Sequence, residues 1–469
     1  MQSGDARKHG VSGQQGQGEG PREPTRAFVV VPVIQDRAGD AAPDKRDDEA
    51  RLSEAVGLAL AIDLDIADAG IVKIKSPRPA TLMGSGKVEE IAARIRIADV
   101  GLVVVDAPLT PIQQRNLEKE WSAKVIDRTG LILEIFGRRA QTNEGRLQVE
   151  LAHLTYQKSR LVRSWTHLER QRGGFGFLGG PGETQIEADR RLIQERITRI
   201  RKELDAVRRH RALHRKGRAR VPYPSVALVG YTNAGKSTLF NRLTQAGVVA
   251  QDMLFATLDP TVRAVTLPHG RQITLSDTVG FISDLPTDLV AAFRATLEEV
   301  IEADLILHVR DISHIDSAAQ SADVLLVLNE LGLGESPANL IEVWNKLDLL
   351  PADERAGMLT RITHVQSSEG SNAGPIAVSA LTGEGIDTLL DAIETWFATE
   401  SSMRHLELDA SDGAALNWIY ENCEVMSRGE VSEKGGIPLT VRVPSSRLAG
   451  FEKRFGALAT GIPPAPITP

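Results

Sequence analysis

Cysteine is nearly absent from this chain, which has Cys423 alone among its 469 residues. One cysteine excludes a disulfide within the chain and a metal site built from several cysteine ligands. Such low usage is typical of proteins in a reducing compartment, so we expect a cytoplasmic location. For Cys423 itself we expect a small, buried, structural role.

Long apolar runs are also missing, although 42% of the residues are hydrophobic. No run has the length that a membrane-spanning helix needs. Residues 1–20 are rich in Gly and Gln and lack the apolar core of a secretion signal, so we expect residues 1–25 to form a disordered tail. The remaining length exceeds one ordinary hydrophobic core and predicts about two to four domains.

Positive charge is concentrated in one segment of a chain whose net charge is −7. Residues 158–220 contain 18 Lys and Arg against 7 Asp and Glu, a balance of +11, so the rest carries about −18. A basic element on an acidic protein is typical of a local contact with nucleic acid. The alternative is a helix whose charges only face solvent.

Residues 230–237 have the spacing G-x-x-x-x-G-K-S of a phosphate-binding loop. The apolar residues 225–229 predict a buried strand before it, and residues 237–243 predict a helix after it. Loop N–H groups and the positive end of that helix then face phosphates. Lys236 would reach the β- and γ-phosphates, and Ser237 would hold Mg²⁺. The alternative is a glycine turn that binds nothing. The expected nucleotide contacts here are Gly230, Tyr231, Thr232, Asn233, Ala234, Gly235, Lys236, Ser237 and Thr238.

Residues 345–348, with the sequence N-K-L-D, predict guanine as the base. They follow the apolar residues 340–344, at the carboxyl end of a strand, where ligands bind in α/β sheets. The Asp348 carboxylate can accept hydrogen bonds from guanine N1–H and N2–H₂, which adenine lacks, and such a site rejects the wrong base roughly 10⁴-fold. In isolation the motif could be a polar turn. The expected base contacts are Asn345, Lys346, Asp348, Ser379 and Ala380.

Two switch segments complete the predicted site. Residues 277–280, with the sequence D-T-V-G, end a predicted strand over residues 271–276. Before that strand, residues 255–261 should supply one Thr to Mg²⁺; we choose Thr257, with Thr261 as the alternative. Loss of the γ-phosphate would release both segments. The predicted metal ligands are Ser237, Thr257 and Asp277, the catalytic groups Lys236, Thr257 and Gly280, and the further nucleotide contacts Asp277, Thr278, Val279 and Gly280.

A glutamine that orients the attacking water is missing, since Phe281 follows Gly280. Hydrolysis by the free protein should therefore be slow and depend on a metal ion, another backbone segment or a partner. Asn233 is similar to the loop asparagine of potassium-activated G proteins, whose carbonyl oxygen helps to bind K⁺, so K⁺ is a candidate cofactor. The alternative is an Asn that is tolerated in a turn conformation.

Residues 26–142 alternate strand-like and helix-like segments, which predicts an N-terminal domain with a parallel sheet flanked by helices. Residues 84–87, with the sequence G-S-G-K, imitate a phosphate loop, but Thr81 replaces its first glycine. The predicted strands cover residues 28–32, 71–74, 102–106 and 124–126, and the predicted helices cover residues 47–62, 88–98 and 111–119.

Residues 143–221 change to helical periodicity, with two apolar seams at alternating spacings of three and four. They predict an antiparallel hairpin of two helices, each about 25 residues and about 38 Å long. The loop at residues 173–182 holds glycines and two Phe, which could approach RNA closely and stack on unpaired bases; a floppy connection is the alternative. We expect residues 210–220 to form a basic linker. The first seam is Leu147, Leu151, Leu154, Leu161, Trp165 and Leu168, and the second is Ile186, Ile193, Ile197, Ile200, Leu204 and Val207.

The fold class predicted for the whole chain is multidomain α/β. After the hairpin we expect a GTPase α/β domain over residues 222–400 and a small α+β domain over residues 401–469, whose role the sequence does not indicate. The expected strands of the last domain cover residues 405–408, 424–430 and 439–443, and its helices cover residues 413–422 and 446–455.

Six motifs, spread over about residues 26–400, are informative when taken together. They are Val125–Thr129, Ile135–Ala140, Gln148–Ala152, Gly180–Gln185, Phe255–Thr261 and Asp277–Phe281. These motifs resemble those of the HflX family, which are ribosome-associated GTPases of the translation-factor-related class. One departure is Gly179, where many relatives carry an arginine.

The resemblance implies the phosphate, switch and guanine roles named above, and the family's apolar replacement of glutamine is similar to Phe281. It also implies binding to the large ribosomal subunit, with the hairpin of residues 158–220 on ribosomal RNA near the peptidyl transferase centre, and dissociation or rescue of ribosomes under stress. We expect the protein to be a monomer. The alternative is a signalling or scaffold G protein whose hairpin binds a protein partner.

Overall fold

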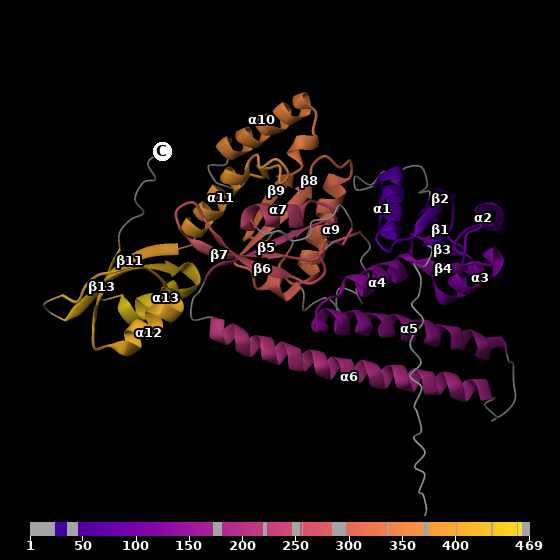
Figure 1. The fold of residues 1–469 in the computed structure, drawn as a ribbon, viewed down its shortest axis with the longest axis horizontal. Helices are drawn as coiled ribbons and strands as arrows, with labels where there is room; N and C mark the ends of the chain where they lie inside the picture. The colour runs from indigo at the N-terminus through magenta and orange to yellow at the C-terminus, as the bar shows by residue number, and fades with distance from the viewer. Residues whose placement is uncertain are drawn as a thin grey trace, which may run out of the picture.

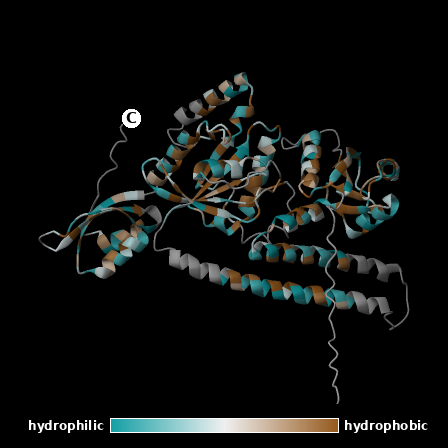
Figure 2. Ribbon diagram, viewed as in Figure 1, coloured by the Kyte–Doolittle hydropathy of each residue, from teal (hydrophilic) through white to brown (hydrophobic). Residues whose placement is uncertain are grey.

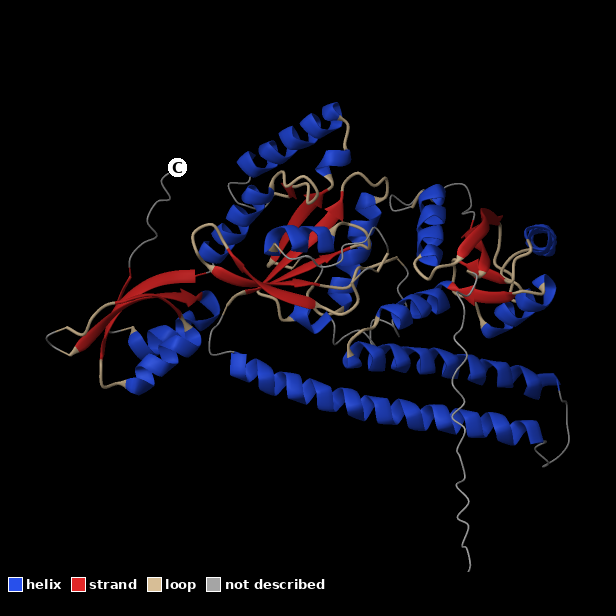
Figure 3. Cartoon of the chain, viewed as in Figure 1, coloured by secondary structure: helices blue, strands red, loops and turns tan. Residues whose placement is uncertain are grey.

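Three sheets and one long helical hairpin make up the part of the chain that the computed structural model describes (Figure 1). Strands form the centre of each sheet-containing part, and helices cover them (Figure 3). The strands of the two α/β sheets are mostly hydrophobic (Figure 2). The predicted multidomain α/β class is thus confirmed. The described residues are 24–34, 46–171, 181–218, 223–245, 254–255, 257–283, 297–334, 337–368, 374–399, 401–432, 435–456 and 458–461.

The N-terminal sheet has the strand order β2-β1-β3-β4, and every pair is parallel, as the sequence predicts. Two apolar clusters bury its faces, because Val29 and Val31 point to one side and Phe28 and Val30 to the other. Its elements are β1 (Arg26–Ile34), α1 (Asp48–Leu60), β2 (Asp65–Ile74), α2 (Ser85–Ala98), β3 (Leu102–Val105), α3 (Pro111–Trp121), β4 (Lys124–Asp127) and α4 (Arg128–Arg139).

Helix α4 is an element that the sequence analysis missed. It starts directly after β4, and the Asp127 side chain caps it by accepting a hydrogen bond from Gly130 N–H. No Gly, Pro or other turn residue separates β4 from α4. The change from the two-residue period of a strand to the 3.6-residue period of a helix is therefore hard to recognise in the sequence. The apolar residues Leu131, Ile132, Ile135 and Phe136, at helical spacing, were the available signal, and all are buried.

The hairpin consists of α5 (Asn143–Gln171) and α6 (Pro181–Arg218). Its antiparallel course follows from two contacts between the helices, because Glu150 pairs with Arg196 and the later Lys158 bonds the earlier Gln194. Within the seam, Leu147, Ile200 and Leu204 are buried against each other. The hairpin is fixed to the N-terminal sheet, since Tyr156 and Arg160 both donate to Asp127, each at 2.6 Å.

The helices differ from the prediction in length. They have 29 and 38 residues instead of about 25, and the expected linker at residues 210–220 is helical up to Arg218. The Arg, Lys, Ala and Leu residues there favour helix without an apolar seam. Most of the glycine-rich loop, residues 172–180, lies outside the described residues, as do the side chains of residues 162–186.

The second sheet has the order β10-β9-β8-β5-β7-β6, in which all pairs are parallel except β6 with β7. The chain turns to opposite sides of β5, so the end of this strand is the topological switch point where α/β sheets bind ligands. Its elements are β5 (Ser225–Gly230), α7 (Lys236–Thr244), β6 (Thr261–Thr266), β7 (Gln272–Asp277), β8 (Leu305–Asp311), α9 (Ser317–Glu330), β9 (Leu340–Asn345), η1 (Leu347–Leu349), α10 (Ala352–Ser368), β10 (Ile376–Ala377) and α11 (Ile386–Thr399).

The C-terminal sheet is antiparallel, with the order β12-β13-β11-β14, and two helices cover it. Cys423 is buried there, as expected, and burial raises the pKa of its thiol to about 12. None of the helices in the described part of the chain combines the length and apolar character that crossing a membrane requires. The elements are β11 (Ser401–Asp409), α12 (Gly413–Asn422), β12 (Glu424–Arg428), β13 (Gly436–Pro444), α13 (Ser445–Phe455) and β14 (Ala459–Gly461).

Candidate nucleotide-binding site

Two glycines shape the loop between β5 and α7. Gly230 has φ +152°, and a Cβ there would lie 2.2 Å from the Val309 carbonyl oxygen. Gly235 has φ +91°, and a Cβ there would lie 2.2 Å from Asn345 Nδ2. No larger residue fits either position, because both the left-handed backbone and the neighbouring atoms forbid a side chain. The loop therefore has the close-packed form that the sequence motif predicts.

Lys236 is buried inside this loop, at the first turn of α7. Its ammonium group donates to the carbonyl oxygens of Gly230 (3.1 Å) and Tyr231 (2.8 Å). Burial lowers its pKa to about 8, against the opposing charge of Asp277. Gly280 lies beside it, since a Cβ there would come within 3.1 Å of Lys236 Nζ. The structure thus brings together the lysine and the glycine that the sequence assigns to the γ-phosphate.

Three oxygen-bearing side chains converge next to the loop. Ser237 Oγ lies 2.9 Å from Thr257 Oγ1, and both hydroxyls contact Asp277 Oδ2, at 2.7 and 2.9 Å. Asp277 is fully buried, burial raises the pKa of its carboxyl group, and its Oδ1 atom has no hydrogen-bond partner within the described residues. Thr261, the alternative to Thr257, starts β6 and pairs with Asp277 through the sheet register.

This set of atoms fits a magnesium ion, because hydroxyl and carboxylate oxygens are the hard ligands that Mg²⁺ prefers, with water and phosphate completing the shell. The unsatisfied, buried Asp277 oxygen is the atom expected of such a site. The described residues contain no group of three or more His, Cys, Asp or Glu side chains that could hold a metal in another way.

Asn345 joins the base-binding segments to the phosphate loop. Its side chain donates to the Ala234 carbonyl oxygen (2.8 Å) and accepts from Ala380 N–H (3.0 Å). Ser379 Oγ donates to Asp348 Oδ1 at 2.5 Å. Lys346 has a left-handed backbone and pairs with Asp311 at 2.7 Å. The two segments that the sequence assigns to guanine therefore meet at one place beside the loop.

The remaining predicted contacts follow the same strand ends. Thr232 and Val279 are buried, and Thr278 donates to the Leu228 carbonyl oxygen at 2.6 Å. Asn233 is exposed and has φ +59°, the left-handed conformation in which Asn is tolerated. Thr238 is half-buried in α7.

Phe281 is part of the hydrophobic core and is 1% exposed. Its backbone pairs with the phosphate loop, since Thr232 N–H donates to the Phe281 carbonyl oxygen and Phe281 N–H donates to that of Gly230. A phenyl ring buried in this way cannot orient water. The position that carries glutamine in other GTPases is therefore occupied here by a core residue.

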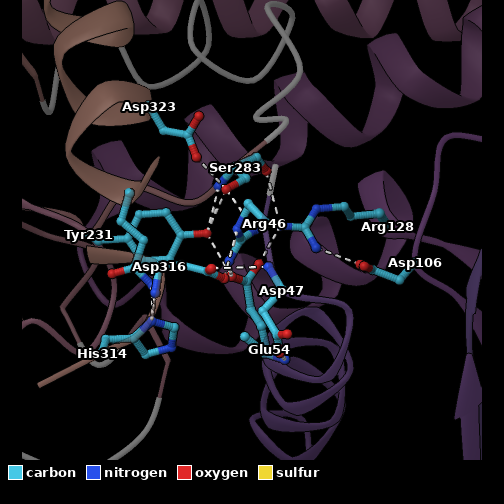
Figure 4. A network of polar contacts seen from close by, with 12 residues as sticks. Arg46, Asp47, Glu54, Asp106, Arg128, Tyr231, Ser283, His314, Asp316 and Asp323 are labelled. Carbon is cyan, nitrogen blue, oxygen red and sulfur yellow. Dashed lines mark hydrogen bonds and ion pairs between the residues drawn. The ribbon is translucent and has the colours of Figure 1, made fainter. Parts of the chain in front are cut away.

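Tyr231 points away from the nucleotide loop towards the N-terminal domain (Figure 4). Its hydroxyl donates to Glu54 of α1 (2.7 Å), contacts Ser283 Oγ (2.9 Å) and accepts from Ser283 N–H (2.9 Å). The sequence motif predicts Tyr231 only as a nucleotide contact. Its side chain instead connects the phosphate loop to α1 and to Ser283, three residues after the switch segment of residues 277–280.

A buried ionic cluster surrounds this tyrosine. Glu54 accepts from Arg46 and Arg128, each at 2.6 Å, and Arg128 also bonds Asp106 and the Ser283 carbonyl oxygen. Burial alone would raise the pKa of Glu54, but the two arginines outweigh it and lower this pKa to about 2. No local sequence signal marks these partners, because Glu54 and Tyr231 are 177 positions apart.

Comparison with known proteins identifies family models along most of the chain. Family models match in chain order: an N-terminal GTP-binding GTPase region (residues 49–137), a GTP-binding GTPase middle region (139–218), a 50S ribosome-binding GTPase (225–346) and an HflX C-terminal domain (364–461).

GTPase HflX of Magnetococcus marinus is 52% identical over 375 residues, which cover 80% of this chain and 84% of that protein. GTPase HflX of Escherichia coli is 44% identical over 370 residues, 79% of this chain and 84% of that one. A crystal structure of a GTP-binding protein from Sulfolobus solfataricus with GDP is 22% identical, covering 79% and 98% of the two chains, with a TM-score of 0.41, too low to support an inference about the site. The chain belongs to the HflX family of GTPases and hydrolyses GTP.

Proposed function

We propose that this GTPase binds the large ribosomal subunit in its GTP form through the basic hairpin, as a cytoplasmic monomer, and dissociates or rescues ribosomes under stress. The family model "50S ribosome-binding GTPase" supports a ribosomal partner. The finer claim, contact with ribosomal RNA, is supported by how charge is arranged on α6.

The observation that carries the proposal is a line of basic residues on α6. Arg191, Lys202 and Arg209 are exposed and spaced by 11 and 7 residues, so at about 100° per residue they lie on one face of the helix. The apolar seam residues Ile200 and Leu204 are buried on the opposite face, against Leu147 of α5. The basic line therefore faces away from the protein, as a surface that binds phosphates requires.

Within the site, we assign each side chain the role that its position supports. Lys236 and the loop N–H groups bind phosphates, Ser237, Thr257 and Asp277 hold Mg²⁺, and Asp348 recognises guanine. The metal would neutralise charge that develops on the phosphates. K⁺ at Asn233 is a further part of the proposal, supported by the exposure of that side chain.

The experiment is co-sedimentation with purified large ribosomal subunits in a non-hydrolysable GTP analogue and in GDP. A triple variant, Arg191→Gln, Lys202→Gln and Arg209→Gln, removes the basic line without touching the seam. We expect weaker binding. The slope of log K against the logarithm of the salt concentration should become less steep by about 2 to 3, which is near one unit for each lost phosphate contact.

The matched control removes three exposed positive charges from the N-terminal domain, by Arg96→Gln, Arg115→Gln and Lys119→Gln. We expect it to sediment like the wild type. Equal binding by the two triple variants would refute the role of α6. Binding that resists both ribonuclease and high salt would favour a protein partner instead.

Phe281 gives the proposal a kinetic consequence. Because the buried Phe281 cannot orient the water, we expect the subunit to accelerate hydrolysis, and groups supplied by a partner can contribute about 10³- to 10⁵-fold in other GTPases. An unchanged single-turnover rate with saturating subunits would contradict an activating role of the ribosome.

A further inference from the structure

The switch segment of residues 255–261 is bonded directly to the residues that precede α5, where the hairpin begins. Asp259 Oδ2 accepts from the N–H groups of Gln141 and Thr142, each at 2.9 Å, and its Oδ1 accepts from the Thr142 hydroxyl at 2.5 Å. Thr142 Oγ1 in turn accepts from Gly145 N–H at 2.9 Å, in the first turn of α5. Asp259 thus supplies the negative charge that a helix N-terminus favours.

The contact is close because residue 145 is a glycine. A Cβ at Gly145 would lie 2.5 Å from Asp259 Oδ1, a distance that real side chains do not adopt. Any other residue there would push the carboxylate away from α5. The sequence therefore provides both the acceptor and the space for it, on segments more than 100 residues apart.

Asp259 lies two residues from Thr257, the threonine of the predicted metal site. Thr257 Oγ1 contacts Ser237 and Asp277 on one side of this short segment. On the other side, Thr261 pairs with Asp277 in the sheet. Anchoring Asp259 therefore restricts where the Thr257 hydroxyl can lie.

A second contact holds the same segment to the N-terminal domain. The Phe255 ring packs edge-to-face on Phe136 of α4, with ring centroids 4.8 Å apart and an interplanar angle of 80°. Phe255 is buried and has φ +56°. The segment thus rests on α4 and on the start of α5 as well as on the nucleotide loop.

We propose that Asp259 is a positioning residue for GTP hydrolysis: by bonding Gln141 and Thr142, directly before α5, it holds the Thr257 hydroxyl at the magnesium site. This part follows from the GTPase activity alone. That the same bond transmits contact at the hairpin to the hydrolytic site rests on the proposed ribosomal partner. The competing explanation is that Asp259 only caps and stabilises α5.

The test uses the full-length protein without ribosomes. Asp259→Asn keeps the size but removes the negative charge, and the NH₂ group that replaces Oδ1 cannot accept from the Thr142 hydroxyl, so the anchor is weakened. Thr142→Val removes the hydroxyl donor, and Thr142→Ser restores it. The matched control is Asp412→Asn, the same change at a capping aspartate of α12, where Asp412 accepts from Ala415 N–H at 2.9 Å in the C-terminal domain.

We expect Asp259→Asn to lower the single-turnover rate about tenfold or more and to raise the Mg²⁺ concentration for half-maximal rate. It should weaken binding of a GTP analogue more than that of GDP. Thr142→Val should do the same to a smaller degree, Thr142→Ser should restore both, and Asp412→Asn should change neither. Wild-type rate and Mg²⁺ dependence in both Asp259→Asn and Thr142→Val, with only a lower melting temperature, would overturn the proposal.

Adding large ribosomal subunits separates the two proposals. If the subunit accelerates the wild type, Asp259→Asn should still co-sediment but lose most of the acceleration. If the subunit neither binds nor accelerates the wild type, the proposed function fails, while the measurements without ribosomes still decide the role of Asp259. Full acceleration of Asp259→Asn would refute transmission through this bond.

Discussion

The hydroxyl of Tyr231 offers the sharpest test of how the N-terminal domain is joined to the GTPase site. We expect Tyr231→Phe to loosen this junction without changing the core, since the ring remains. The hydroxyl is the common partner of Glu54, Ser283 N–H and Ser283 Oγ, and Tyr231 is only 4% exposed.

The free energy cost of removing the Tyr231 hydroxyl depends on which of its partners keep other hydrogen bonds. Glu54 retains Arg46 and Arg128, and Ser283 Oγ retains Arg46 and Asp323. The Ser283 N–H is left buried without its acceptor, which costs about 1–3 kcal/mol. A value of about 2 kcal/mol corresponds to roughly 30-fold in the local opening equilibrium.

The assay is amide hydrogen exchange of the full chain, followed in a peptide that ends at Ser283. We expect exchange at this amide to accelerate roughly 30-fold in Tyr231→Phe. The control is Tyr420→Phe, the same chemical change at a tyrosine of α12 that is 41% exposed. Wild-type exchange at Ser283 in Tyr231→Phe would show that the hydroxyl does not hold the junction, and would refute the reasoning.

Three further predictions concern the base, the ionic cluster and the cation. Asp348→Asn should shift base preference from guanine to xanthine nucleotides, because the amide can donate to the xanthine 2-carbonyl; competition binding measures this, and an unaltered preference would contradict the assignment. The pKa of Glu54 is lowered from 4.5 to about 2, so its ionised form stabilises the fold fully above pH 4.5 and loses that effect as the pH falls towards 2. Glu54→Gln should therefore destabilise at pH 7, with the deficit shrinking by on the order of 3 kcal/mol across this window in denaturant titrations; a pH-independent deficit would argue against a charged Glu54. Hydrolysis should be faster in K⁺ than in Na⁺ buffer if Asn233 helps to bind potassium, and equal rates would remove that role.

Local motifs are enough to propose the candidate nucleotide site from sequence, and the structure brings the predicted segments together. A phosphate loop needs glycines at fixed positions, as the atoms that oppose a Cβ at Gly230 and Gly235 show. Asn345 and Ser379 follow strand ends that the apolar periodicity reveals. Such signals lie within a few residues of each other, so one sequence is enough to read them.

The connections between domains were not predictable, for a physical reason. Glu54 with Tyr231 and Asp259 with Thr142 are ordinary polar residues whose meaning depends on partners more than 100 positions away. Nothing near Asp259 in the sequence distinguishes a carboxylate that caps a distant helix from one that faces solvent. Only the packing of the domains selects these pairs.

The attachment of α5 at both its root and its middle has a mechanical consequence. Asp259 bonds the residues directly before α5, and Asp127 accepts from Tyr156 and Arg160 in its middle, so a tilt of this helix would move the N-terminal sheet with it. At 1.5 Å per residue the 29 residues of α5 extend about 44 Å, and a tilt of about 10° at the root would carry the distant end through about 8 Å. An ångström-scale rearrangement around one phosphate group could in this way be amplified to roughly the breadth of a nucleotide.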